Sequence, residues 1–427
     1  MRTTMTSAWR WRSVTRRPEL GAVPNATRPL ERLSGNLPGQ CFDHHGGPIL
    51  RGVTAVTSAP VPPAPVAVTP QAQPFPHTQV MSLREWRERR RLHQERVDAW
   101  LGPHLERRRR GEKHPVEDFL FTYYSFRPAQ LRRWHPGLGV VLEGADPAEL
   151  GPHYVLTPIP MEIPAGVFDN AAVSRTVDRG ARDHASASAY ESSPTPALES
   201  SSPAHPATRG ASGATLSFQL LQRRRSSLEW ITQLLERTAG RTPYFGCFGM
   251  HEWAMVYKLP ASQVRHAAWP LRLSEEETAR VVEERGVRCS HFDAFRFFTP
   301  PARPLNVLQP TRELQPELEQ PGCLHANMDL YKLAYKLSPL VGSDLIADCF
   351  ALARQIRVLD MRASPYDLRG LGLSPVCVET AAGRAEFAAA QREFAAQATP
   401  LRDRLLAECR RLLALADALD GVVNGSP

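Results

Sequence analysis

The chain has 427 residues, enough for two or three domains, but 39 of them are prolines, about twice the usual share, and they cluster. No stretch approaches the ~18 consecutive apolar residues of a membrane helix, so we expect no membrane partner. Seven cysteines without a CxxC pair exclude a disulfide scaffold and a Cys-rich zinc module, and they indicate a reducing cytoplasm. The net charge of +8 is concentrated in residues 1–136, which favours a polyanionic partner.

Residues 1–80 are not typical of a folded domain. They carry many arginines and a run of prolines from Pro60 to Pro76, with too little apolar surface to offset the entropy of ordering the chain. A helical pattern with Trp86, Val97 and Trp100 begins after Met81. Two interpretations remain open: residues 1–80 are a disordered extension, or Met81 is the true start.

A second break falls at residues 180–215, where Ser, Ala, Pro and Gly predominate. This composition predicts a flexible insertion between residues 82–175, a basic and aromatic-rich first part, and residues 216–420, a helical remainder. The first part alone offers few core positions, so we expect one folded domain that the insertion interrupts.

The later segments have helix start and stop signals. Capping boxes at Ser226–Glu229 and Ser274–Glu277 predict helices that end at Gly240 and Gly286. Further helices are expected over 344–362, 384–398 and 401–419, the last two separated by Pro400. Extended runs are few, at 140–142, 154–159 and 376–378. The predicted fold is therefore mainly α with a small β component.

Four segments concentrate aromatic, histidine and carboxylate residues: 111–137, 245–258, 290–306 and 323–339. In the first, aromatic residues alternate with arginines, a pattern that suits base stacking and phosphate binding, although a buried aromatic helix is the alternative. In the others, His251 and Glu252 are adjacent, His291 and Asp293 share a face of an extended chain, and His325 and Asp329 share a face of a helix that includes both. A core role for each histidine is the alternative.

His251, His291 and His325 could also converge on a divalent metal, with neighbouring carboxylates as further ligands. No HExxH spacing supports this, and we find no P-loop, no GxSxG and no convincing GxGxxG. We therefore expect no cofactor, and keep a metal site at these three histidines as the alternative.

The same four segments resemble a bacterial family, common in actinobacteria, that is catalogued as 3-methyladenine DNA glycosylase. The resemblance covers roughly residues 82–175 and 215–415, and members of the family begin near the equivalent of Met81. It implies monofunctional hydrolysis of the N-glycosidic bond of an alkylated purine, with alkylated DNA as partner.

Such an activity requires an extruded base to stack between aromatic rings and a carboxylate to stabilise the transition state. The candidates are assigned by these roles. Catalytic residues would be Glu252, Asp293, His251 and His291; substrate would contact Tyr123, Tyr124, Arg127, Trp134, Phe245 and Trp253; and Arg132 and Arg133 would hold the strand. Two alternatives are a metal-dependent hydrolase or oxygenase acting on a small molecule, and a nucleic-acid-binding protein without catalysis.

Overall fold

The computed structural model describes residues 79–124, 126–159 and 212–424, with side chains up to Gly421, all within one compact unit of the chain. The predictions for residues 1–78 and for most of the 180–215 insertion lie outside these ranges. Within them, the prediction of a mainly helical fold with a small β component is confirmed.

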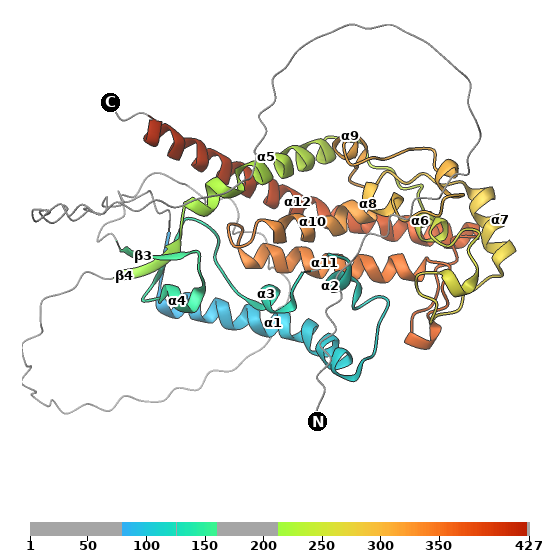
Figure 1. The fold of residues 1–427 in the computed structure, drawn as a ribbon, viewed down its shortest axis with the longest axis horizontal. Helices are drawn as coiled ribbons and strands as arrows, with labels where there is room; N and C mark the ends of the chain where they lie inside the picture. The colour runs from blue at the N-terminus through green and yellow to red at the C-terminus, as the bar shows by residue number, and fades with distance from the viewer. Residues whose placement is uncertain (1–78, 125, 160–211, 425–427) are drawn as a thin grey trace, which may run out of the picture. The chain divides into compact units, whose positions relative to one another are not determined.

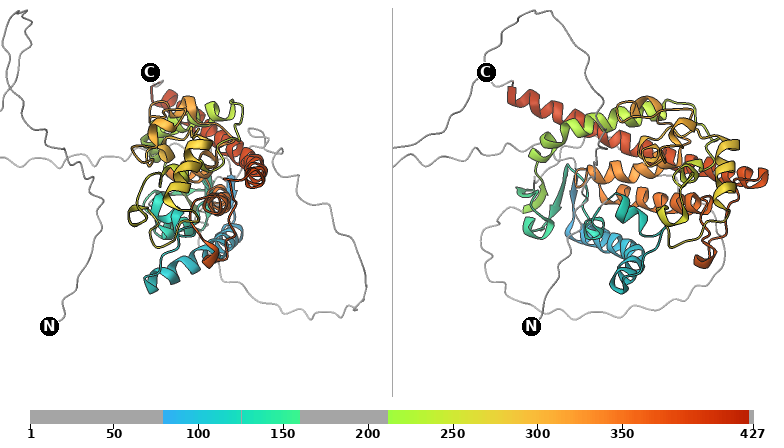
Figure 2. Two further views of the ribbon diagram at one scale, coloured as in Figure 1. Left: turned by 90° about the vertical axis from the view of Figure 1, so that its right-hand side faces the viewer. Right: turned by 45° about the vertical axis from the view of Figure 1, so that its right-hand side comes forward.

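Three long helices form the centre of the fold. Helices α10 (Leu324–Lys336) and α11 (Ser343–Arg362) pack on each other and on α12 (Ala381–Asn424). Helix α5 (Gln219–Ala239) runs along α12, and α1 (Leu83–Arg110) contacts α11 from the other side (Figures 1 and 2). The largest hydrophobic core follows these contacts, so side chains on α10 and α11 are enclosed by helices.

A four-stranded sheet covers one end of this bundle (Figure 1). Its strands are β1 (Gln79–Met81), β2 (Val140–Glu143), β3 (Tyr154–Pro158) and β4 (Ser212–Leu216), in the order β1-β2-β4-β3. β1 pairs with β2 in parallel, whereas β4 is antiparallel to both of its neighbours. Gly213 in β4 is required by packing, since an added Cβ would lie 2.6 Å from the carbonyl oxygen of Leu142.

Short helices and irregular segments close the other end of the bundle, where α6, α7 and α8 lie (Figure 1). The remaining helices are α2 (Phe119–Tyr123), α3 (Pro128–Arg132), α4 (Pro147–Leu150), α6 (Met250–Ala254), α7 (Glu275–Arg285), α8 (Phe292–Phe295) and α9 (Gln315–Leu318), with 3-10 turns at Ala261–Gln263, Arg303–Leu305 and Arg369–Leu371. The predicted capping box of Ser274 and Glu277 opens α7, and that helix ends at Gly286 as expected. Within the described ranges, none of the helices has the length and apolar composition that a bilayer-spanning segment requires.

Two helix predictions are corrected by tertiary packing. Helix α5 begins at Gln219, so Ser226 lies inside it and caps nothing; Leu220 and Leu221 are buried and extend the apolar stripe upstream. Pro400 does not separate two helices but lies inside α12. A proline removes one backbone hydrogen bond, and the buried residues on both sides of it, Ala398 and Leu405 among them, offset that cost.

Two β predictions also change. Residues 212–215, assigned to the flexible insertion, form most of β4. Val376 and Val378 belong to no strand of the described sheet; both side chains are buried in a loop, in which Val376 N donates to the carbonyl of Arg362. Both differences depend on contacts with residues outside the segment itself.

Candidate functional site

All four motif segments converge on one small pocket between the short helices and the central bundle. Its lining includes Tyr123 from the first segment, Glu252 from the second, Asp293 from the third and His325 from the fourth, and α11 adds Arg357. The free space is about 10 Å³, which is room for roughly one water molecule. The pocket is therefore narrow, and the charged side chains that line it already interact with other residues of the protein.

A tight turn places the second segment. Phe248 and Gly249 both have positive φ values, 47° and 71°, and α6 starts at the next residue. A Cβ at residue 249 would lie 3.3 Å from the ring of Phe387 and 3.4 Å from Ala363, so glycine fits both the conformation and the space. This turn directs the first residues of α6 toward α11.

His251 and Glu252 each bind a different residue of α11. His251 Nε2 lies 2.8 Å from Asp360 Oδ1, and Arg357 Nη1 donates to Glu252 Oε1 at 2.7 Å. The same Arg357 nitrogen donates to Asp360 Oδ2 at 2.6 Å, which joins the two pairs into one network. All four side chains are buried, so water does little to screen these interactions.

The charges in this network depend on one another. Burial opposes a charge on His251, but the Asp360 carboxylate outweighs burial and raises the pKa of His251 well above its ordinary value. Burial likewise opposes ionisation of Asp360, whereas the charge of His251 lowers the pKa of that carboxyl. The two residues therefore form a buried ion pair with Asp360 ionised.

His325 lies in the first turn of α10 and completes the cluster. Its ring stands edge-on to that of His251, with centroids 4.4 Å apart, and stacks on that of His291 at 5.3 Å. Burial and then the charge of His251 lower the pKa of His325 well below its ordinary value, so its imidazole is neutral. Among described residues, none makes a hydrogen bond to this ring, which leaves a nitrogen lone pair available.

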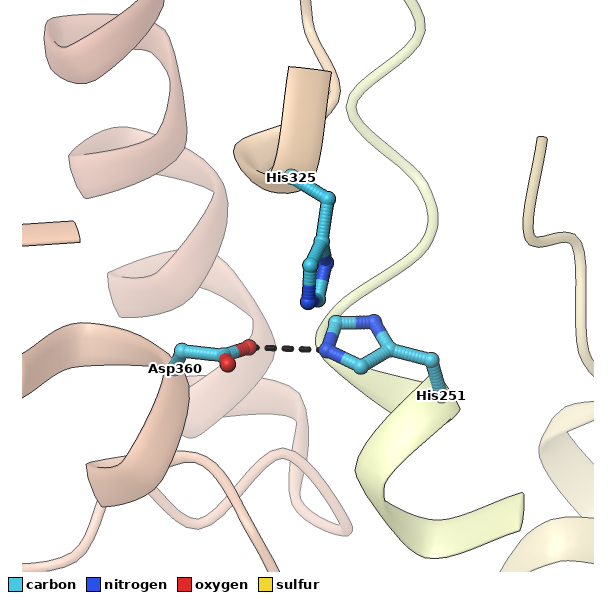
Figure 3. A group of neighbouring side chains, drawn as sticks. All are labelled: His251, His325 and Asp360. Carbon is cyan, nitrogen blue, oxygen red and sulfur yellow. Dashed lines mark hydrogen bonds and ion pairs between the residues drawn. The ribbon is translucent and has the colours of Figure 1, made fainter. Parts of the chain in front are cut away.

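His251, His325 and Asp360 together have the arrangement of a cation site. One donor atom from each lies within 4.8 Å of the other two, and all three residues are buried. Figure 3 shows the His325 ring directed toward the space between the His251 ring and the Asp360 carboxylate. Asp360 thus takes the place that the sequence prediction gave to His291.

His291 belongs to a second buried network instead. Its Nε2 lies 3.2 Å from Asp329 Oδ2, and Tyr124 Oη donates to Asp329 Oδ1 at 2.7 Å. Lys332 Nζ donates to Asp329 Oδ2 at 2.8 Å and to Asp293 Oδ2. Burial raises the pKa of Asp329, but Lys332 and His291 together outweigh burial and lower that pKa, so this carboxylate is ionised. Through its bond to Lys332, this network also holds Asp293, which lines the small pocket.

The remaining predicted substrate contacts do not assemble into one aromatic cage. Of them, Tyr123 lines the pocket, whereas the hydroxyl of Tyr124 is held by Asp329. Trp253 is fully buried and its Nε1 donates to the Ala363 carbonyl, and Trp134 is also buried in the core. Phe245 lines a different surface pocket, with Arg392 near its ring.

The predicted phosphate-binding arginines also separate. Arg132 makes a two-pronged ion pair with Asp98, at 2.6 and 2.9 Å. Arg133, the next residue, lines a larger pocket near the sheet, and Arg127 is exposed before α3. Along α1, many arginines pair with glutamates one turn away, for example Arg91 with Glu88 and Glu95, so much of the predicted basic surface is already neutralised.

Sequence reasoning did not assign Asp360 or Arg357 to the site. A signal was present: the buried stripe of α11 that contains Cys349, Ala353 and Ile356 continues to Asp360 at helical spacing. A carboxylate on a buried stripe needs a partner. The sequence could not identify that partner as His251, because the two residues meet only through tertiary packing.

Comparison of the chain with models of protein families, with curated proteins and with solved structures finds no match. The resemblance of the four segments to a DNA glycosylase family therefore stays a prediction, and the function must be argued from the site itself.

Proposed function

We propose that the protein is a metal-dependent hydrolase whose divalent cation is held by His251, His325 and Asp360. The observation that carries this proposal is the meeting of three buried donor atoms within 4.8 Å of one another. Metal bonds of about 2.0–2.2 Å require donors some 3–4 Å apart, so small movements of these side chains suffice. Two imidazoles and one carboxylate suit zinc and iron better than calcium or magnesium, which prefer oxygen ligands.

The surrounding residues match the needs of such a centre. A cation would replace the proton shared by His251 and Asp360, so the charge of the cluster would change by one unit. Arg357 would keep its bond to the second oxygen of Asp360 and orient this ligand. Three protein ligands leave a position for water, and the pocket beside them has room for one.

Hydrolysis is favoured because Glu252 lies beside the cation group without belonging to it. A divalent cation lowers the pKa of a bound water, and a neighbouring carboxylate can accept its proton. Glu252 has this place, held by Arg357 at 2.7 Å. Arg357 would then balance the negative charge that develops when water attacks a polar bond.

A substrate would reach this centre past Tyr123, Phe297 and Arg265, which line the outer part of the pocket and are all partly or fully exposed. The guanidinium of Arg265 lies 5.0 Å from the centre of the Phe297 ring, and the Tyr123 and Phe297 rings are 6.2 Å apart. Since the space behind them holds about one water, these side chains must move aside for a substrate to bind.

Metal analysis of the full chain tests the proposal. After incubation with Zn²⁺, Fe²⁺ or Mn²⁺ and removal of free metal, we expect one ion per chain, and its loss in His251→Ala, His325→Ala and Asp360→Asn. His266→Gln is the matched control, because His266 lines the same pocket but is not in the cation group. If none of the three metals is retained, or if the three ligand variants retain it like the control, the proposal is wrong.

Hydrolysis of the N-glycosidic bond of an alkylated purine in DNA is the second candidate. Its support is that Tyr123, Glu252 and Asp293 line one pocket, so an aromatic ring and both predicted carboxylates are together. The test is release of methylated purines from alkylated DNA by metal-free protein. If metal-free protein releases the base and Glu252→Gln or Asp293→Asn abolishes the release, this candidate is favoured over the metal centre. If release requires added metal, the metal-dependent hydrolase is favoured.

A further inference from the structure

A larger pocket lies near the sheet, at the other end of α10 from His325. It encloses about 360 Å³, within the usual range for small-molecule sites. Its residues come from α3 and the segments on both sides of it, from the end of α4 and the start of β3, from α5, and from the end of α10 with the residues that follow. His325 and Lys336 are eleven positions apart on α10, or about 16 Å along the helix, so this pocket is distinct from the candidate metal centre.

The charged side chains that line this pocket are all positive. Three cations line it, Arg133, Arg224 and Lys336, and its lining contains no carboxylate. Among the described residues, no acidic side chain pairs with any of the three, although most arginines of α1 have such partners. Burial and then the nearby charges of Lys332 and Arg312 lower the pKa of Lys336, and together they exceed the opposing effect of Asp329 and Asp293.

The backbone is shaped to hold one of these cations. Gly151, at φ 120°, lies under the Arg133 guanidinium, and a Cβ at residue 151 would be 3.2 Å from Arg133 Nη1. Close by, Tyr154 is 91% buried and its hydroxyl has no hydrogen-bond partner among the described residues. A buried hydroxyl without a partner is unusual, and a ligand oxygen would supply one.

The pocket also has aromatic residues in its lining. The rings of Phe126 and Tyr335 stack at 3.9 Å between centroids, and the Tyr335 hydroxyl donates to Gln130 at 2.6 Å, which fixes its ring. Aromatic rings and a group of cations that line the same pocket suit a ligand that joins a planar group to an anion. The pocket is concave and of limited volume, which favours a small molecule over a continuous nucleic-acid strand.

We propose that this pocket binds a nucleoside monophosphate or a small molecule of the same chemical class, with its phosphate on Arg133, Arg224 and Lys336 and its planar ring on the rings of Phe126 and Tyr335. The site goes beyond the proposed hydrolysis, because it lies too far from His325 for its ligand to contact the metal centre. The contacts to phosphate are ionic and partly exposed, so affinity should fall as salt concentration rises.

Isothermal titration of the full chain with AMP tests this proposal. We expect binding that weakens at least tenfold in each of Arg133→Gln, Arg224→Gln and Lys336→Met, since each loses one charged hydrogen bond. Arg132→Gln and Arg223→Gln are the matched controls: both are exposed neighbours in sequence that do not line the pocket, and they should bind AMP normally. Thermal melting confirms that every variant is folded.

Three results would overturn the proposal. If AMP does not bind, or if the pocket variants bind AMP as tightly as the control variants, the pocket is not a nucleotide site. If inorganic phosphate binds as tightly as AMP, the pocket is a simple anion site and the aromatic rings do not contribute to binding. A single-stranded oligonucleotide that binds more tightly than AMP, and that Arg132→Gln weakens as much as Arg133→Gln, points to a diffuse nucleic-acid surface. Titrations with and without added metal are expected to agree, so failure of the metal proposal leaves this result interpretable.

Discussion

His251 and Asp360 are 109 residues apart in the chain, yet His251 Nε2 and Asp360 Oδ1 lie 2.8 Å from each other in the interior. Asp360 also accepts a hydrogen bond from Arg357, whose only other hydrogen bond to a side chain among the described residues is to Glu252. One carboxylate of α11 therefore balances both a histidine of α6 and an arginine of its own helix. This relationship is the basis of the proposed metal site, and it has consequences for stability as well.

Replacing Asp360 by Asn should destabilise the fold strongly. The change leaves Arg357 and His251 buried with less negative charge beside them, and removing one partner of a buried pair costs about 3–5 kcal/mol. Asp348→Asn on the same helix is the control, because Asp348 pairs with Arg96 and Arg404 at the surface and should contribute about 0–1 kcal/mol. Urea unfolding of metal-free protein measures both, and equal midpoints would contradict the prediction.

Lys332→Met should also lower the free energy of unfolding, by roughly 3 kcal/mol or more. Lys332 is the cation between Asp293 and Asp329, and without it two nearby carboxylates lose their shared partner. The matched change Lys336→Met, one turn further along α10 and exposed, should have little effect on stability. Comparison of the two variants by thermal melting gives the difference directly.

Gly249→Ala should destabilise the turn before α6, by about 1–3 kcal/mol. Residue 249 has φ 71°, and the new Cβ would press against Phe387 and Ala363. Gly102→Ala is the control, because Gly102 lies inside α1 with nothing within 4 Å of its Cβ position; there alanine should stabilise by about 0.5–1 kcal/mol. Opposite signs for the two changes are expected in the same denaturation assay.

Acid should destabilise the protein through His135. Burial, then the charges of His93 and Arg133, lower the pKa of His135 to about 3 in the folded state, so the unfolded chain binds the proton more readily. Its contribution to stability is full above the ordinary histidine pKa of ~6.5 and decreases as the pH falls toward about 3, at up to ~1.4 kcal/mol per pH unit.

The corresponding variant is His135→Gln, whose side chain can still bond Ser338 in place of the imidazole, which lies 2.9 Å from the Ser338 hydroxyl. Between pH 6.5 and 4.5 its unfolding free energy should fall less steeply than that of the natural chain. Parallel curves for the two proteins would show that His135 does not titrate as argued.

The sequence by itself determined the local elements that depend on nearby residues. The capping box of Ser274 and Glu277 predicts the start of α7 because both residues bond within one turn. Periodicity predicts α11, and the mainly helical class follows from several such segments. The sequence also identified the four segments whose side chains line one pocket, since buried histidines and carboxylates are uncommon enough to be noticed.

Tertiary structure alone decided which of those side chains meet. His291 pairs with Asp329 while His251 pairs with Asp360, a choice that depends on how α6, α10 and α11 pack rather than on spacing along the chain. The same holds for Pro400, which stays inside α12 because long-range burial outweighs a local backbone cost. Contacts between distant residues have no signature in local pattern, because many pairings satisfy the same periodicity and only one packs without leaving buried charges unpaired.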